Sequence, residues 1–199
     1  MTGVGAVINT ASAREEDSIA IVGLGGVGLS ALLASIAIGS KKTIAIDLSN
    51  EKLNLAHELG ADHILNPNDA NFLERIRDLT SGGANIAIET AGSGRALKTA
   101  YDITRRGGTT VAAGMPGPKV DITLSHLSIA AEERIIKGSY MGSCIAHRDI
   151  PKYLDMFQTG KLPVDRLLSR KITFEDLNAA MDRLDAVSYT HLTLPTTDR

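Results

Sequence analysis

The glycine-rich stretch at residues 18–30 constrains the fold of this chain more than any other feature. Its sequence, SIAIVGLGGVGLS, places Gly23, Gly25 and Gly28 directly after a short apolar run. This G-x-G-x-x-G spacing is typical of a turn between a buried β-strand and a helix, at which a dinucleotide binds. The first glycine lets the chain turn sharply, the second leaves room for a pyrophosphate, and the third lets the helix pack closely. We therefore predict an anion site at the N-terminus of the following helix.

A second apolar run, at residues 43–46, ends in Asp47. In dinucleotide-binding folds, a carboxylate about 20 residues beyond the glycine turn accepts hydrogen bonds from a ribose. Leu48 and Ser49 follow Asp47, so no arginine stands directly after it to neutralise a 2′-phosphate. The segment from the glycine turn to Asp47 therefore predicts NAD as the cofactor in preference to NADP.

Strands and helices are expected to alternate along the rest of the chain. The predicted strands lie at residues 19–22, 43–46, 63–66, 86–88, 109–113 and 135–141. This alternation predicts an α/β fold, a doubly wound parallel six-stranded sheet of the Rossmann type. We assign residues 1–187 to this domain with its flanking helices. Residues 188–199 are rich in threonine and continue neither pattern, so they are predicted to be a non-native or disordered tail.

Composition argues against several classes of partner. Residues 19–40 carry no charge and are long enough to span a bilayer, but each clustered glycine would cost up to about 1 kcal/mol in a helix. We therefore predict no membrane association. A net charge of −2 and an aromatic content of 4% give no basis for nucleic-acid binding. The single cysteine and the lack of a leader sequence predict a cytoplasmic protein.

No catalytic or metal-binding residue is predicted within the chain. Cys144 and His147 lie three residues apart, but tetrahedral zinc needs three or four protein ligands and no others cluster beside them. A hydrolase triad has no anchor, because the G-x-S-x-G motif does not occur. The charge runs at residues 105–106 and 132–134 are expected to be solvated surface.

Six short motifs occur in a fixed order, and with them the chain resembles the cofactor-binding half of the zinc-dependent medium-chain alcohol dehydrogenases. The resemblance extends from Thr2 to about Val187. The motifs are TGVGA at residues 2–6, VGLGGVGLS at 22–30, DLSNEK at 47–52, ELGA at 58–61, GG at 107–108 with AGMP at 113–116, and KGSYMG at 137–142.

The resemblance implies a set of NAD-binding residues. The pyrophosphate would be held by the turn that Gly23 opens, through Gly25, Gly26, Val27 and Gly28. Asp47 and Lys52 would bind the adenosine ribose. The residues implied at the nicotinamide end are Thr2, Thr90, Ala91, Ala113, Gly114, Met115, Ser139 and Tyr140.

By the same resemblance, the full-length enzyme transfers a hydride between a primary alcohol or aldehyde and NAD. Its catalytic zinc would be bound by residues upstream of Met1, so this chain would orient the cofactor and the isolated fragment would be inactive. The predicted edge strand at residues 135–141 would leave backbone groups unpaired, and the resemblance implies that this edge pairs across a homodimer. Two alternatives stay open: a non-catalytic NAD-binding module or sensor, and a zinc-free quinone or enoyl reductase of the same superfamily.

Overall fold

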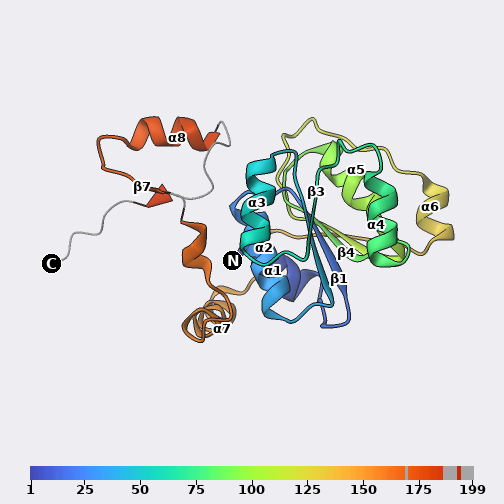
Figure 1. Cartoon of the computed structure of the whole chain (residues 1–199), viewed down its shortest axis with the longest axis horizontal. Helices are drawn as coiled ribbons and strands as arrows, with labels where there is room; N and C mark the ends of the chain where they lie inside the picture. Colours follow the sequence, from blue (N-terminus) through green and yellow to red (C-terminus); the bar gives the residue numbers. More distant parts are fainter. Residues whose placement is uncertain (169, 186–191, 194–199) are drawn as a thin grey trace.

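Six parallel strands form one sheet in the computed structural model, which describes residues 1–168, 170–185 and 192–193 (Figure 1). The strands run in the order β3-β2-β1-β4-β5-β6. Their bounds are β1 (Ser18–Val22), β2 (Lys42–Ile46), β3 (His63–Leu65), β4 (Ala84–Glu89), β5 (Thr104–Ala112) and β6 (Ile135–Gly138). The order changes direction between β1 and β4, which confirms the predicted doubly wound fold.

Helices cover both faces of this sheet (Figure 1). Those that connect the strands are α2 (Gly26–Ala37), α3 (Asn50–Glu58), α4 (Phe72–Thr80), α5 (Gly94–Ile103) and α6 (His126–Ala131). The chain begins with α1 (Thr2–Gly5) and a π-helical turn, η1 (Ala6–Thr10). After β6 come the 3-10 turn η2 (Met141–Ser143), α7 (Ala146–Gln158), a second 3-10 turn η3 (Val164–Leu167) and α8 (Leu177–Asp185). Within the described residues, no helix is both long and apolar enough to traverse a bilayer.

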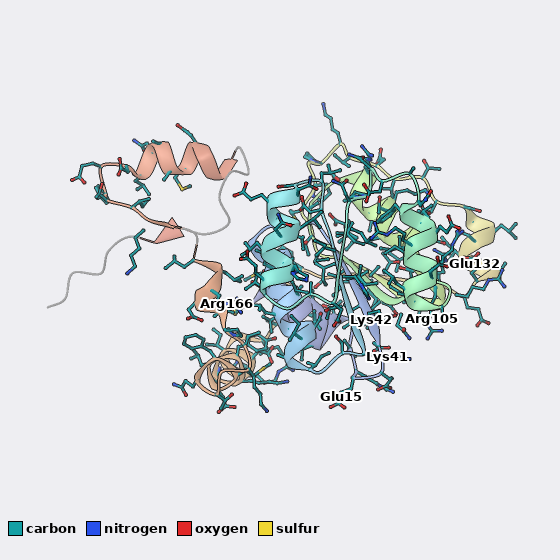
Figure 2. All side chains as sticks on the ribbon, in the orientation of Figure 1. Glu15, Lys41, Lys42, Arg105, Glu132 and Arg166 are labelled. Atoms are coloured by element: carbon teal, nitrogen blue, oxygen red, sulfur yellow. The ribbon has the colours of Figure 1, made fainter. Side chains whose placement is uncertain are left out.

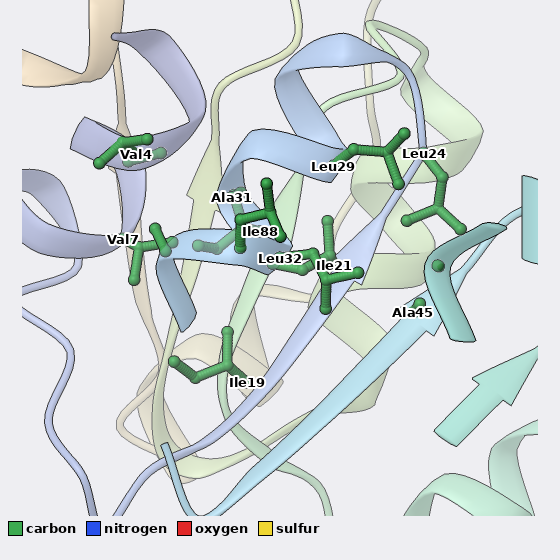
Figure 3. Packing of buried hydrophobic residues seen from close by; sticks show 14 of the residues in the cluster. Val4, Val7, Ile19, Ile21, Leu24, Leu29, Ala31, Leu32, Ala45 and Ile88 are labelled. Atoms are coloured by element: carbon green, nitrogen blue, oxygen red, sulfur yellow. The ribbon is translucent and has the colours of Figure 1, made fainter. Parts of the chain in front are cut away.

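Successive residues of β1 pack into two separate hydrophobic cores. Ile19 and Ile21 are fully buried in a cluster that includes Leu29 of α2 (Figure 3). Val22 belongs to the second cluster, together with Ile76 of α4. A strand that is buried on both faces is typical of a parallel sheet covered by helices. The glycine turn therefore starts from a strand whose position is fixed by packing.

The sixth strand is shorter than predicted, because β6 ends at Gly138 and the predicted strand continues to Met141. The hydroxyl of Ser139 lies 2.8 Å from that of Thr10 in η1, which directs the chain toward the first helical segment. Met141 then adopts a positive φ of 48° and enters η2. The prediction of an edge strand is nevertheless confirmed, since β6 is the last strand of the sheet.

A polar cluster joins this first helical segment to α7. The amide nitrogen of Asn9 in η1 donates to Asp149 Oδ2 and to the hydroxyl of Tyr153, both at 3.2 Å. Arg148 donates to Asp149 Oδ1 at 2.7 Å, and this hydrogen bond lowers the pKa of the Asp149 carboxyl to about 2. The cluster therefore holds η1, and α1 before it, against the rest of the domain.

The prediction of solvated charge runs is partly wrong. Arg105 is exposed where β5 begins, at the edge of the sheet where Lys41 and Lys42 stand at the start of β2 (Figure 2). The side chain of Arg134, by contrast, is only 13% exposed, pairs with Glu132 at 2.5 Å and lies over the ring of Tyr101. Arg134 was predicted to be solvated, but cation–π packing on Tyr101 leaves its side chain largely buried.

The predicted tail is described at two residues only. Leu192–Thr193 forms β8, which pairs in parallel with β7 (Arg170–Lys171) in a separate two-stranded sheet. The other residues from 188 to 199, and the boundary at 187, lie outside the described residues. The assignment of a non-native or disordered tail therefore stays a prediction.

Candidate functional site

The glycine turn lies between β1 and α2, at the edge where the parallel strands end. Gly23 has a φ of +95°, which side-chain-bearing residues rarely adopt, and its N–H donates to the carbonyl of Ile46 at 2.8 Å. A Cβ on Gly28 would lie 1.9 Å from the carbonyl oxygen of Gly23. Both glycines are therefore required by the turn itself.

Gly25 is different, because no contact within the described part of the chain requires it to be glycine. Its φ of −76° suits any residue, and a Cβ placed on it would meet no atom within 4 Å. Gly25 is the N-cap of α2, and no side chain caps this helix. The N–H groups of Gly26, Val27 and Gly28 come first in the helix and have no acceptor within it. An open approach beside free N–H groups fits a pyrophosphate.

Asp47 connects the glycine turn with the loop that follows β2. Its Oδ2 accepts the N–H of Leu24 at 2.7 Å, and its Oδ1 accepts the N–H of Ser49 at 2.9 Å. A carboxylate offers about four lone-pair sites, so Asp47 retains acceptor capacity for the hydroxyls of a ribose. The residue is therefore both a structural tie and a candidate ligand.

Thr90 holds the turn from its other side, directly after β4. Its hydroxyl donates to the carbonyl of Gly23 at 2.6 Å, and its N–H donates to the carbonyl of Val22 at 2.9 Å. These bonds join the ends of the two strands between which the sheet order changes direction. Thr90 therefore stabilises the turn, and its hydroxyl is already engaged there.

Glu89, the last residue of β4, is a buried carboxylate that sequence analysis missed. Only 2% of its surface is exposed, and its Oε1 accepts the N–H of Gly92 at 2.6 Å. Its main-chain carbonyl accepts the N–H groups of Ala113 and Gly114, each at 2.9 Å. Burial raises the pKa of Glu89, while backbone N–H groups oppose that rise. Glu89 therefore joins the loops that follow β4 and β5.

A cavity of about 160 Å³ opens beside Asp47 at the same edge of the sheet. Three of the predicted residues, Gly23, Asp47 and Ala91, line it. The other lining residues were not predicted: Val22, Ile46, Leu48, Pro67, Ser93, Arg95, Ala96 and Thr99. Most of these are apolar, so the cavity combines an apolar wall with a carboxylate at one side.

The chain matches a known protein family. A family model described as zinc-binding dehydrogenase matches residues 26–159, from the first turn of α2 to the end of α7. The chain belongs to the zinc-binding dehydrogenase family. The resemblance to the cofactor-binding half of medium-chain alcohol dehydrogenases is thereby confirmed.

Individual members of this family match nearly the whole chain. Geraniol dehydrogenase of Castellaniella defragrans is 35% identical over 181 residues, which cover 90% of this chain and 48% of that protein. An alcohol dehydrogenase zinc-binding domain protein from Burkholderia ambifaria superposes with a TM-score of 0.93 at 30% identity, over 99% of this chain and 53% of that one. Benzyl alcohol dehydrogenase from Acinetobacter calcoaceticus gives a TM-score of 0.92 at 30% identity, over 97% and 53%. The chain thus spans about half the length of these dehydrogenases.

Only one of the residues that the resemblance implies at the nicotinamide end, Ala91, lines the cavity. Residues 113–115 follow β5, and Met115 is 75% exposed. Ser139 is buried with its hydroxyl engaged by Thr10, so only its main chain is left to bind a ligand. The neighbouring Tyr140 is 72% exposed. These residues lie at the ends of β5 and β6, whereas the cavity lies at the ends of β1, β2 and β4.

Thr2 and Lys52 also lie outside the cavity lining. Thr2 begins α1, where the next residue, Gly3, packs so closely on α2 that a Cβ there would lie 2.0 Å from the carbonyl of Val27. Lys52 lies in the first turn of α3, where its N–H donates to the hydroxyl of Ser49 at 3.4 Å. The structure therefore brings Thr2 near the glycine turn and Lys52 near the loop that carries Asp47.

The described residues do not fit a zinc ion, although the family is named for one. Within residues 1–168, 170–185 and 192–193, no three His, Cys, Asp or Glu side chains come together where a metal could be held. The candidate site in the described residues consists of backbone N–H groups, Asp47 and an apolar cavity.

The raised pKa of Glu89 predicts a pH dependence of stability. The folded chain binds this proton more tightly than the unfolded chain, so the stabilisation is complete below the ordinary pKa of 4.5 and is lost as pH rises through the folded pKa. Glu89→Gln stays neutral and keeps an acceptor for the N–H of Gly92. Wild type loses this stabilisation as the pH rises and the variant does not. We therefore expect the urea midpoint of the variant minus that of wild type to be larger at about pH 8 than at about pH 5. Glu15→Gln, at an exposed acid, is the control; a relative midpoint for Glu89→Gln that is constant with pH would contradict this account.

Proposed function

We propose that this chain is the NAD-binding domain of an oxidoreductase that transfers a hydride between a primary alcohol or aldehyde and NAD. The observation that carries the proposal is the open approach to Gly25, beside free N–H groups at the start of α2. Membership of the zinc-binding dehydrogenase family supports it. Geraniol and benzyl alcohol, after which two of the relatives are named, are both primary alcohols.

Each part of the site has a proposed task in binding the cofactor. Backbone N–H groups from Gly25 to Gly28 hold the pyrophosphate, because a helix N-terminus carries partial positive charge. Asp47 accepts hydrogen bonds from the adenosine ribose, and the apolar cavity beside it takes the adenine. Glu89 holds the loops after β4 and β5 in register, so that the main chain of residues 113–115 can bind the nicotinamide carboxamide. NAD supplies the hydride-accepting carbon of the nicotinamide ring.

The proposed enzyme is larger than this chain. Zinc would be held outside the described residues, and when bound it would supply Lewis-acid chemistry at the alcohol oxygen. The isolated chain is accordingly proposed to bind NAD without turning over alcohol. Substrate choice would lie with the residues around that zinc.

Two further proposals concern assembly and location. β6 is an edge strand with unpaired backbone groups, and Ile135 and Ile136 on it are 45% and 42% exposed, which suits pairing with β6 of a second copy. We therefore propose a homodimer. The free thiol of Cys144 is compatible with a reducing compartment, so we propose the cytoplasm.

Binding of NADH to the Gly25→Ala variant tests the proposed site. A Cβ at this position meets no atom of the described residues, so the variant is expected to fold, with a slightly lower unfolding temperature because alanine is a poorer N-cap than glycine. The same methyl group would occupy the approach of the pyrophosphate, so we expect NADH affinity, measured by calorimetry, to fall about tenfold or more. Gly117→Ala is the matched control, because a Cβ there also meets no atom within 4 Å. Equal affinity in both variants, or no binding by wild type, would refute the proposal.

The choice of NAD over NADP has its own test. Asp47→Ser combined with Leu48→Arg removes the carboxylate that repels a 2′-phosphate and adds a cation beside it. Because Asp47 also holds Leu24, the double variant is expected to weaken both cofactors somewhat, so the ratio of their affinities is the informative quantity. We expect the NADH to NADPH affinity ratio to fall about tenfold or more. An unchanged ratio would show that Asp47 does not select the cofactor.

A further inference from the structure

The turn η2, directly after β6, has a left-handed backbone. Its three residues, Met141, Gly142 and Ser143, have φ values of 48°, 70° and 51°. The N–H of Ser143 closes the turn by donating to the carbonyl of Tyr140 at 2.9 Å. Residues with a side chain enter this region rarely and singly, because the Cβ crowds a carbonyl oxygen. Strained backbone of this kind persists only where the surrounding structure holds it, and it is concentrated at ligand sites.

Thr10 of η1 holds the left-handed turn at both ends. Its hydroxyl lies 2.8 Å from that of Ser139, which precedes the turn, and 2.9 Å from that of Ser143, which ends it. A hydroxyl has one proton and two acceptor sites, so Thr10 can serve both partners at once. Thr10 is only 9% exposed and Ser139 only 7%, so water cannot easily replace the bond between them. The neighbouring Asn9 donates to the carbonyl of Gly142 at 3.3 Å. Side chains of η1 therefore hold the turn along its whole length.

The helix α1 connects this turn with the glycine turn through main-chain contacts. A Cβ on Gly142 would lie 2.6 Å from the carbonyl oxygen of Thr2, and one on Gly5 would lie 2.3 Å from the carbonyl oxygen of Gly142. A Cβ on Gly3 would lie 2.0 Å from the carbonyl oxygen of Val27 in α2. Close packing of α1 on both elements thus sets the distance between the start of α2 and the turn after β6.

We propose that Thr10 is a positioning residue for the nicotinamide half of the dinucleotide. The inference rests on the proposed function, in which the dinucleotide extends from the glycine turn toward the ends of β5 and β6. In that arrangement the nicotinamide meets the main chain of Ser139 and Tyr140, which Thr10 holds through the hydroxyls of Ser139 and Ser143. The packing of α1 on α2 does not involve Thr10. Loss of the Thr10 hydroxyl therefore weakens the nicotinamide contacts and spares those of the pyrophosphate and the adenosine.

Calorimetric titration with NADH and ADP-ribose tests this role, because ADP-ribose lacks the nicotinamide and keeps the rest of the dinucleotide. Wild type is expected to bind NADH more tightly than ADP-ribose. Thr10→Val keeps the shape of the side chain and removes its hydroxyl. We expect it to weaken NADH about threefold to tenfold and to change the affinity for ADP-ribose less than about twofold. Thr10→Ser keeps the hydroxyl and should restore the wild-type ratio of the two affinities. The emission maximum of saturating NADH should shift toward that of free NADH in Thr10→Val and not in Thr10→Ser.

Thr104→Val is the matched control. Thr104 is also a buried threonine with two hydrogen bonds, to the carbonyl of Ala100 at 2.7 Å and to the hydroxyl of Thr110 at 2.9 Å. It lies where β5 begins, at the opposite edge of the sheet. This variant is expected to lower the unfolding temperature as Thr10→Val does, and to bind both ligands like wild type.

Several outcomes would overturn the assignment. If Thr10→Val weakens NADH and ADP-ribose by the same factor, or binds both like Thr104→Val, Thr10 serves the fold alone. If wild type binds the two ligands equally well, the dinucleotide site stands and the positioning role is wrong. If wild type binds neither, the proposed function itself fails. Ser143→Ala, at an exposed position, removes one of the two hydroxyl contacts and serves if Thr10→Val does not fold. It is expected to lower the same affinity ratio by a smaller factor, and an unchanged ratio would contradict the role of Thr10.

Discussion

The close approach of Gly28 to the carbonyl of Gly23 is the contact on which the rest of the site depends. Because a Cβ would lie 1.9 Å from that oxygen, only glycine lets the first turn of α2 pack onto the end of β1. That packing sets the direction of α2 and leaves Gly25 facing open space. β1 is buried on both faces, so the turn is built on the most constrained strand of the sheet.

Two acidic residues at strand ends, Asp47 and Glu89, hold the neighbouring loops in place around this turn. Asp47 binds the N–H groups of Leu24 and Ser49, and Glu89 binds that of Gly92. Asp47 thus ties the loops after β1 and β2, Glu89 ties those after β4 and β5, and Thr90 joins the ends of β1 and β4. Each carboxylate is held by backbone N–H groups, a geometry that fixes loops without long side chains. The site is consequently preorganised along one edge of the sheet.

The sequence allowed the fold and the glycine turn to be predicted because both depend on local patterns. Apolar runs located all six strands, and the spacing of Gly23, Gly25 and Gly28 located the turn between β1 and α2. The end of β6 was placed too late, since it depends on Ser139 meeting Thr10, far away in the chain. Arg95 was missed for the same reason: only the folded sheet brings α5 beside the loops after β2 and β3. Glu89 carried a usable signal, an acid ending an apolar strand, which is the pattern already used for Asp47.

The central claim is that a nicotinamide dinucleotide binds across the carboxyl edge of this sheet. The most direct measurement is the change in backbone amide chemical shifts when NADH is added to the isotopically labelled chain. The largest changes are expected at Gly25, Val27, Leu48 and Gly92, with little change at Lys41 and Arg105 at the opposite edge. Shifts concentrated at the amino ends of the strands, or no saturable shifts at all, would contradict it.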